Sequence, residues 1–263
     1  MMRAHWIAAL FAACSIGAAC SPAARPTAPP SDYTATIPPT GPDGATIRRG
    51  ENLMNHTKRF LPQFVGANMN CSSCHIDAGR SRGPLSLVGI FGQYPEFSDR
   101  SNHVVGMRDR IAECFFFSMN GEPPSYYGPD LIAIEAYVAF LSVGARVGPA
   151  PPTPRPQAMP TGDKGAGAKL YASKCVACHG ANGAGDPAAG FPALWGPTSF
   201  NKRAGMNHVM PIFVKANMPL GQGGTLSDRE AADVSAYVLS HARPSFDPAK
   251  LKDVTSAELR YFL

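Results

Sequence analysis

The sequence has few charged residues and, after its first twenty residues, no long apolar run. Both absences limit the classes of protein to which it can belong. Only 16% of its 263 residues are charged, and the net charge of +5 is scattered without any run of Lys or Arg. That pattern argues against a nucleic-acid partner. Outside the first twenty residues, no stretch has the length and the apolar character of a membrane-spanning helix. No segment alternates apolar and polar residues long enough to indicate a strand, so the sequence predicts a mainly α-helical protein.

Cysteine is also scarce, with seven in the chain, and four of the seven fall in two identical patterns. These C-x-x-C-H pentapeptides comprise Cys71, Cys74 and His75, and Cys175, Cys178 and His179. In such a pattern the two thiols attach haem c and the histidine coordinates the iron. A zinc site would need four ligands, and each pentapeptide offers three. We therefore predict two covalently attached haem c groups as cofactors.

The 26 glycines and 26 prolines indicate a loop-rich chain divided by stiff linkers. A haem would supply much of the core of each small domain, which is marginal without it. We predict an export signal at 1–20, a disordered Pro-rich tether at 21–44, a first cytochrome c domain at 45–148, a linker at 149–160, a second cytochrome c domain at 161–243, and a C-terminal tail at 244–263.

The N-terminus predicts export to the periplasm. Arg3 supplies a positive start, and the apolar stretch at 6–19 is too short to span a membrane. Export agrees with haem c, which is assembled outside the bacterial cytoplasm. Residues 17–20 form a possible lipoprotein cleavage box, so two interpretations of Cys20 stay open. It is removed with the leader, or it carries a lipid anchor that tethers the protein to a membrane.

The two halves repeat each other weakly. A Gly-x-x-Leu pattern at 50–53 and 167–170 precedes each haem motif, and Ala-Tyr-Val at 136–138 and 236–238 closes each half. Residues 227–230 predict a capping box at the start of the last helix. This order of opening helix, haem loop and closing helix resembles two class I cytochrome c domains in tandem.

Each haem iron has a sixth position, and its occupant sets the redox potential. In the second half, Met206 and Met218 are the candidates. In the first half, Cys114 is the one cysteine of the mature body without an attachment role, and Met107 and Met119 are its rivals. Cys114 is either a small buried apolar residue or a thiolate ligand that lowers the potential.

Three further stretches, at 89–100, 110–121 and 191–221, make the chain similar to the dihaem thiosulfate dehydrogenases that form tetrathionate. That family is related to the cysteine-ligated sulfur-oxidation cytochromes. With both haem motifs, the similarity spans roughly residues 47–243. The resemblance implies that His75 and Cys114 ligate the first haem. It implies that His179 and a methionine ligate the second haem, with Met206 favoured and Met218 as the alternative.

Two positions depart from the family pattern. Some relatives carry a lysine directly before the methionine and exchange ligands on reduction. Here that position is Gly205, so the resemblance implies constant His/Met ligation. Relatives often carry Arg directly before the serine, whereas Phe117 precedes Ser118 in this chain and removes one anion contact.

Arginines near Cys114 suit a small sulfur oxyanion as substrate. Two thiosulfate dianions repel each other by several kcal/mol at contact in a low-dielectric pocket unless cations lie nearby, and arginine forks suit oxyanions. We expect Arg80 and Arg82 to pair with haem propionates or acidic groups instead. The predicted catalytic residues are Cys114, Arg100, Arg110 and Ser118.

The predicted function is therefore a periplasmic dihaem thiosulfate dehydrogenase. It would couple two thiosulfates to tetrathionate at the His/Cys haem and pass electrons through the His/Met haem to an external cytochrome c or similar acceptor. Two alternatives stay open. One is a dihaem electron carrier without its own substrate, in which Met107 or Met119 ligates the first haem. The other is a tetrathionate reductase that uses the same site.

Overall fold

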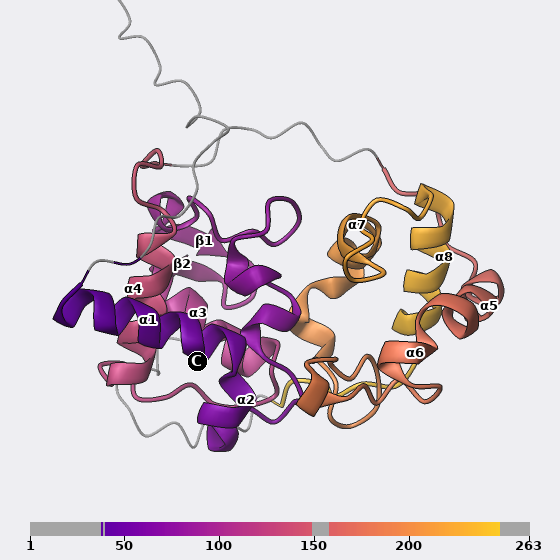
Figure 1. The fold of residues 1–263 in the computed structure, drawn as a ribbon, viewed down its shortest axis with the longest axis horizontal. Coiled ribbons are helices and arrows are strands. Elements are labelled where there is room, and N and C mark those ends of the chain that lie inside the picture. Colours follow the sequence, from indigo (N-terminus) through magenta and orange to yellow (C-terminus); the bar gives the residue numbers. More distant parts are fainter. Residues whose placement is uncertain (1–37, 39, 149–157, 248–263) are drawn as a thin grey trace, which may run out of the picture.

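The chain forms two helical domains that lie side by side (Figure 1). The computed structural model describes residue 38 and residues 40–148 and 158–247. The predicted export signal, Cys20 and most of the predicted tether and linker fall outside these residues, as does most of the predicted tail. In the described part of the chain, no helix combines the length and the apolar character that crossing a membrane requires.

The first domain is built from α1 (Pro42–Asn55), α2 (Thr57–Phe60), α3 (Met107–Phe117) and α4 (Pro129–Phe140). Short 3-10 helices at Pro62–Phe64, Cys71–Ser73, Asp77–Gly79 and Phe91–Gln93 shape the loops. An antiparallel hairpin, β1 (Glu96–Ser98) paired with β2 (His103–Val105), precedes α3. The sequence predicted no strand here, because strands of three residues are too short to show an alternating pattern.

The second domain contains α5 (Lys164–Lys174), α6 (Val176–His179), α7 (Met206–Asn217) and α8 (Asp228–Leu239), with 3-10 helices at Pro187–Ala189 and Lys202–Ala204. The predicted capping box at the start of α8 is confirmed. The Glu230 backbone N–H donates to Ser227 Oγ at 3.2 Å, and the Ser227 N–H donates to the Glu230 carboxylate at 2.8 Å. Two N–H groups that the helix leaves unpaired are thus satisfied at once.

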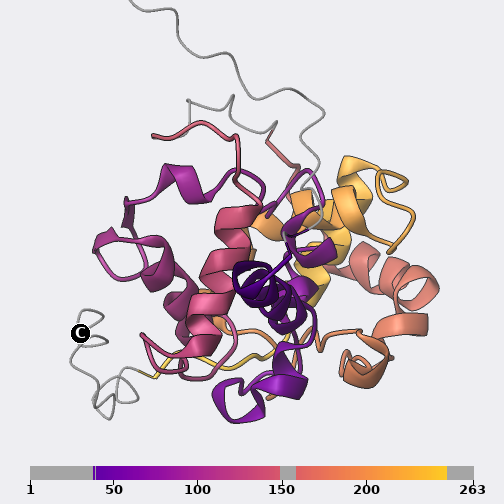
Figure 2. The ribbon, with the colours of Figure 1, turned by 60° about the vertical axis from the view of Figure 1, so that its left-hand side comes forward.

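The residues of the internal repeat lie where two helices cross, and the crossing is the same in both domains. α1 packs on α4, and α5 packs on α8 (Figure 2). A Cβ added to Gly50 would lie 2.0 Å from the Ala133 carbonyl oxygen, and one added to Gly167 would lie 2.0 Å from that of Asp233. Only glycine therefore allows the two backbones to approach this closely.

The two domains are joined by hydrogen bonds between polar side chains and backbone. Asn201 Nδ2 donates to Asn120 Oδ1 at 2.9 Å, and Asn120 Nδ2 donates to the Ser199 carbonyl at 2.5 Å. The Asn201 backbone N–H also donates to the Ser118 carbonyl at 2.9 Å. These bonds connect the end of α3 to the segment that precedes α7.

The segment after α8 returns to the first domain. The Lys202 N–H donates to the Pro244 carbonyl at 3.0 Å. The Phe246 ring then meets the Phe117 ring edge to face, with centroids 4.7 Å apart. Phe117 is 1% exposed and forms part of the core. The segment that follows α8 thus helps to cover the core of the first domain.

Candidate active site

The histidines of both C-x-x-C-H pentapeptides are held by a backbone carbonyl at Nδ1. His75 Nδ1 lies 2.7 Å from the Leu85 carbonyl oxygen, and His179 Nδ1 lies 3.1 Å from that of Pro192. A ring nitrogen that donates to a carbonyl leaves the other nitrogen, Nε2, as the metal ligand. Burial lowers the pKa of His179, an effect that the Pro192 carbonyl partly offsets. Burial thus favours the neutral form that binds metals.

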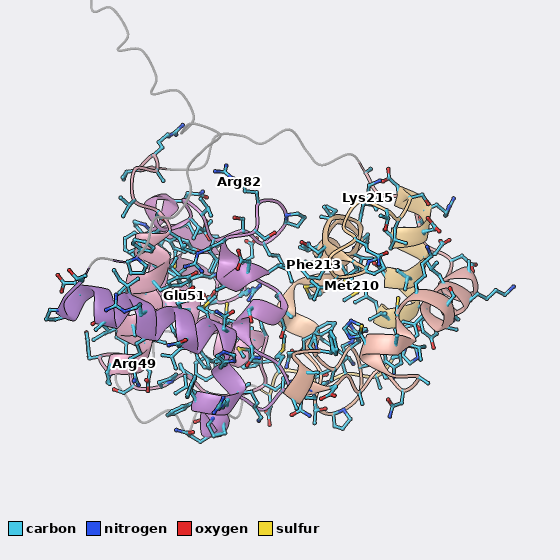
Figure 3. The ribbon with its side chains drawn as sticks, viewed as in Figure 1. Arg49, Glu51, Arg82, Met210, Phe213 and Lys215 are labelled. Atoms are coloured by element: carbon cyan, nitrogen blue, oxygen red, sulfur yellow. The ribbon has the colours of Figure 1, made fainter. Side chains whose placement is uncertain are left out.

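A largely apolar cavity surrounds His179. Its walls come from α5, α7 and α8 and include Met210 and Phe213, which Figure 3 labels. Residues of the first haem-attachment loop also line it, namely Met69, Ser72, Ser73, Cys74 and Ile76. The residues therefore fit a covalently attached haem, since they combine two thiols, a free imidazole nitrogen and an apolar lining. The two attachment sites adjoin each other at this wall.

Three methionines line the same cavity. Met206 begins α7, Met210 follows one turn later, and Met218 comes directly after the helix ends. Met206 and Met210 are 6% and 4% exposed, whereas Met218 is half-buried. Both methionines considered from the sequence are therefore at the cavity, together with Met210, which sequence reasoning did not consider.

Cys114 faces the histidine of the first attachment loop. Its sulfur lies close enough to the His75 imidazole for that ring to act on the pKa of the thiol. Burial raises the pKa of Cys114, but the His75 imidazole and the charges of Arg110 and Arg100 outweigh burial and lower the pKa to about 7. By contrast, burial raises the pKa of Cys71 to about 11 and that of Cys74 to about 12. The environment therefore favours a thiolate at position 114 alone among these three.

The rival methionines of the first domain belong to its core. Met107 is 7% exposed at the start of α3, and Met119 is 3% exposed just beyond its end. Both pack in the hydrophobic cluster with the three phenylalanines that follow Cys114. Cys114 itself is half-buried.

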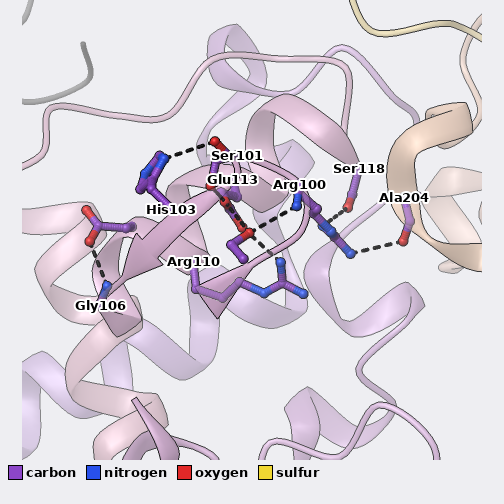
Figure 4. A network of polar contacts seen from close by, with 10 residues as sticks. Arg100, Ser101, His103, Gly106, Arg110, Glu113, Ser118 and Ala204 are labelled. Carbon is purple, nitrogen blue, oxygen red and sulfur yellow. Dashed lines mark hydrogen bonds and ion pairs between the residues drawn. The ribbon is translucent and has the colours of Figure 1, made fainter. Parts of the chain in front are cut away.

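Helix α3 and the residue that caps its C-terminus place three predicted site residues on one face. Arg110, Cys114 and Ser118 are spaced by four, which is the spacing of neighbours along a helix. Arg100 reaches them from the turn of the β1–β2 hairpin. Its Nη1 donates to Ser118 Oγ at 3.4 Å, and its Nη2 donates to the Ala204 carbonyl of the second domain at 3.2 Å (Figure 4).

Arg110 is an anchored cation beside Cys114. Its Nη1 donates to Glu113 Oε2 at 2.8 Å. Burial lowers the pKa of Arg110, but negative charge at Cys114 and the bond to Glu113 outweigh burial, and the pKa is raised overall. The guanidinium therefore stays charged at any working pH.

Two nearby arginines point elsewhere. Arg80 pairs with Glu51 at 2.6 Å, as expected of an arginine that binds an acidic group rather than substrate, and lies over the Tyr137 ring at 5.2 Å. Arg108 Nε donates to Glu135 at 2.8 Å. Arg110 lies one helical turn before Cys114 in the sequence, and Arg108 does not. This spacing could have distinguished Arg110 from Arg108 as a candidate site residue.

Two residues of this site escaped sequence reasoning. Tyr94 lies close enough to Arg110 and Cys114 for their charges to act on it, and burial raises its pKa. Glu113 is 0% exposed and bonds Arg110. Its position three residues after Arg110 is a signal that was present in the sequence, because i,i+3 pairs meet on a helix.

Both domains match models of known protein families. Residues 62–147 match the model of the SoxA/TsdA cytochrome c domain, and residues 165–242 match that of cytochrome c. The thiosulfate dehydrogenase of Stutzerimonas stutzeri is 37% identical over 85% of this chain and 76% of its own length. That of Allochromatium vinosum is 39% identical over 81% and 83%.

The chain belongs to the thiosulfate dehydrogenase family. A solved structure titled thiosulfate dehydrogenase (TsdBA), from Marichromatium purpuratum in its as-isolated form, matches with a TM-score of 0.71 at 35% identity. The match covers 88% of this chain and 51% of that one, so the chain spans about half of that solved protein. Family membership confirms two cytochrome c domains in tandem in a haem-binding oxidoreductase.

Proposed function

We propose that this thiosulfate dehydrogenase family member is an exported dihaem enzyme that joins two thiosulfates into tetrathionate. The two electrons released would pass to an external cytochrome c or a similar acceptor. The observation that carries the proposal is the placement of the Cys114 thiol beside His75, with Arg110 and Arg100 near enough to lower its pKa. An electron carrier has no need of a thiol and fixed cations at its iron-binding histidine.

The residues around Cys114 would hold and orient the two anions. Arg100 and Arg110 offset the repulsion between thiosulfate dianions, which costs several kcal/mol at contact in a low-dielectric pocket. Ser118 Oγ, which accepts a hydrogen bond from Arg100, has a proton to donate to an oxyanion. When bound, haem supplies the acceptance of electrons one at a time and their onward transfer.

For the first haem, we propose ligation by His75 and Cys114. For the second, we propose His179 and a methionine. The family pattern favours Met206. Met206 and Met218 both line the cavity around His179, so both are placed where a ligand is needed. We therefore propose Met206 as the ligand and keep Met218 as the alternative.

The location and the partner are also proposals. The leader at 1–20 supports a periplasmic enzyme, and Cys20 supports either soluble export or a lipid tether. The wall shared by the two attachment sites supports electron flow from the first haem to the second. Electrons would then leave from the second domain.

Turnover by the purified protein with both haems tests the proposal. Thiosulfate should reduce ferricyanide, with two ferricyanides consumed for each tetrathionate formed. Sulfate, an oxyanion of the same charge that cannot be coupled, is the control and should give no reduction. Absence of thiosulfate-dependent reduction contradicts the proposal. If the protein then oxidises a reduced dye only when tetrathionate is added, the reductase alternative is favoured.

A further inference from the structure

Glu113 is a fully buried carboxylate at the centre of a hydrogen-bond network. It is 0% exposed and accepts from Ser98 Oγ at 2.7 Å, Ser101 Oγ at 2.5 Å and Arg110 Nη1 at 2.8 Å (Figure 4). A buried carboxylate is costly unless its oxygens are paired with donors. Here three donors meet it, and they come from the two elements that carry the candidate substrate arginines.

Glu113 reaches Arg110 through the geometry of α3. Successive helix residues point about 100° apart, so Glu113 faces the hairpin although Cys114 follows it in the sequence. Arg110 lies three residues before Glu113 and four before Cys114, so its guanidinium can serve both. The ion pair with Glu113 fixes that guanidinium beside the thiol.

Glu113 also fixes the turn that carries Arg100. Ser98 and Ser101 flank Arg100, and both hydroxyls donate to Glu113. Ser98 Oγ in turn accepts from the Arg100 backbone N–H at 3.3 Å. The chain on both sides of Arg100 is thus tied to the same carboxylate.

We propose that Glu113 is a positioning residue that holds both Arg110 and Arg100 in place for the two substrate anions at Cys114. This inference rests on the proposed function and deepens it. Glu113 acts through the two arginines, and it determines how tightly thiosulfate binds.

A rival role makes the opposite prediction. If Glu113 were only a counter-ion, it would weaken the attraction between Arg110 and an anion, and its neutralisation would lower the KM for thiosulfate. If Glu113 is a positioning residue, its neutralisation frees both arginines and raises the KM. The sign of the change therefore separates the two roles.

The test compares Glu113→Gln with the wild type, both carrying both haems. We expect the KM for thiosulfate to rise about tenfold, the effect of weakening one charge-assisted hydrogen bond, with kcat changed less. Thiosulfate binding to the electrochemically reduced protein, which cannot turn over, should weaken by a similar factor. Glu135→Gln breaks the Arg108–Glu135 pair, which joins α3 to α4, and should leave the KM within about twofold.

Two further variants keep the inference testable. Ser101→Ala removes a single donor to Glu113, and should raise the KM about threefold. It decides the question if Glu113→Gln does not yield folded protein. In a double-mutant cycle, Glu113→Gln should add less in an Arg110→Gln background than in the wild type.

Several outcomes overturn the inference. They are an unchanged or lower KM in folded Glu113→Gln, an unchanged KM in Ser101→Ala where only that variant folds, or full additivity with Arg110→Gln. Failure of the wild type to oxidise thiosulfate contradicts the proposed function itself. That result is distinguishable, because it appears before any variant is compared.

Discussion

The sulfur of Cys114 lies beside the imidazole of His75, close enough for that ring to help lower the pKa of the thiol to about 7. Among the described residues, Cys114 is the one cysteine outside the two C-x-x-C-H pentapeptides, and it faces the histidine of the first, which we propose as an iron ligand. Thiolate and imidazole can therefore serve the same iron. A thiolate ligand pushes electron density onto iron and lowers its potential, whereas a thioether raises it. The ligand that Cys114 could provide therefore distinguishes the proposed enzyme from a simple electron carrier.

Replacement of Cys114 by Ala should abolish turnover and keep both haems. The attachment thiols are elsewhere, so covalent haem content should be unchanged. We expect the thiolate-type low-spin EPR signal to disappear and thiosulfate oxidation to fall at least about 100-fold. Met119→Leu is the matched control, because Met119 is buried nearby, and it should keep the EPR signal. An EPR signal that survives in Cys114→Ala would favour the carrier with methionine ligation.

The two candidate methionines of the second domain can be separated by matched substitutions. Met206→Leu should remove the thioether charge-transfer band of the oxidised haem and lower the potential of that haem by on the order of 0.1 V. Met218→Leu preserves side-chain volume on the cavity wall and should leave both unchanged. The measurement is a spectroelectrochemical titration of each variant. The reverse pattern would make Met218 the ligand.

Loss of either arginine beside Cys114 should weaken thiosulfate binding. Arg100→Gln and Arg110→Gln each remove a fixed cation, so the KM should rise about tenfold or more and depend less on salt. Arg108→Gln is the control on the same helix, since Arg108 pairs with Glu135. Steady-state kinetics at two ionic strengths check this. Equal effects from Arg108 and Arg110 would show that only net charge matters.

The parts of the fold that could be predicted from the sequence depend on local spacing. The C-x-x-C-H pentapeptides specify their cofactor, and Ser227 with Glu230 marks the start of α8 within four residues. The glycines of the repeat were visible as a pattern. Their cause became clear only from the structure: the helices cross so closely that an added Cβ would lie 2.0 Å from the facing carbonyl oxygen.

The remaining parts depend on contacts between residues that are distant in the sequence. Glu113 resembles an ordinary helix-surface acid until the hairpin serines are seen to cover it. The three-residue strands carry no periodicity of their own. Phe246 follows the last predicted helix and gives no sign that its partner is Phe117 in the other domain.

That last contact predicts that the C-terminal segment stabilises the first domain. Phe246→Ala removes an edge-to-face pair with Phe117 and should lower the free energy of unfolding by about 1–2 kcal/mol. Haem content and the KM for thiosulfate should stay near wild type, because Arg100 and Arg110 are held by other contacts. Phe97→Ala, at a ring that is 57% exposed on the hairpin, is the control and should change stability little. Denaturant unfolding followed at the haem absorbance gives the measurement. Equal stability of Phe246→Ala and wild type would mean that the segment rests on the first domain without supporting it.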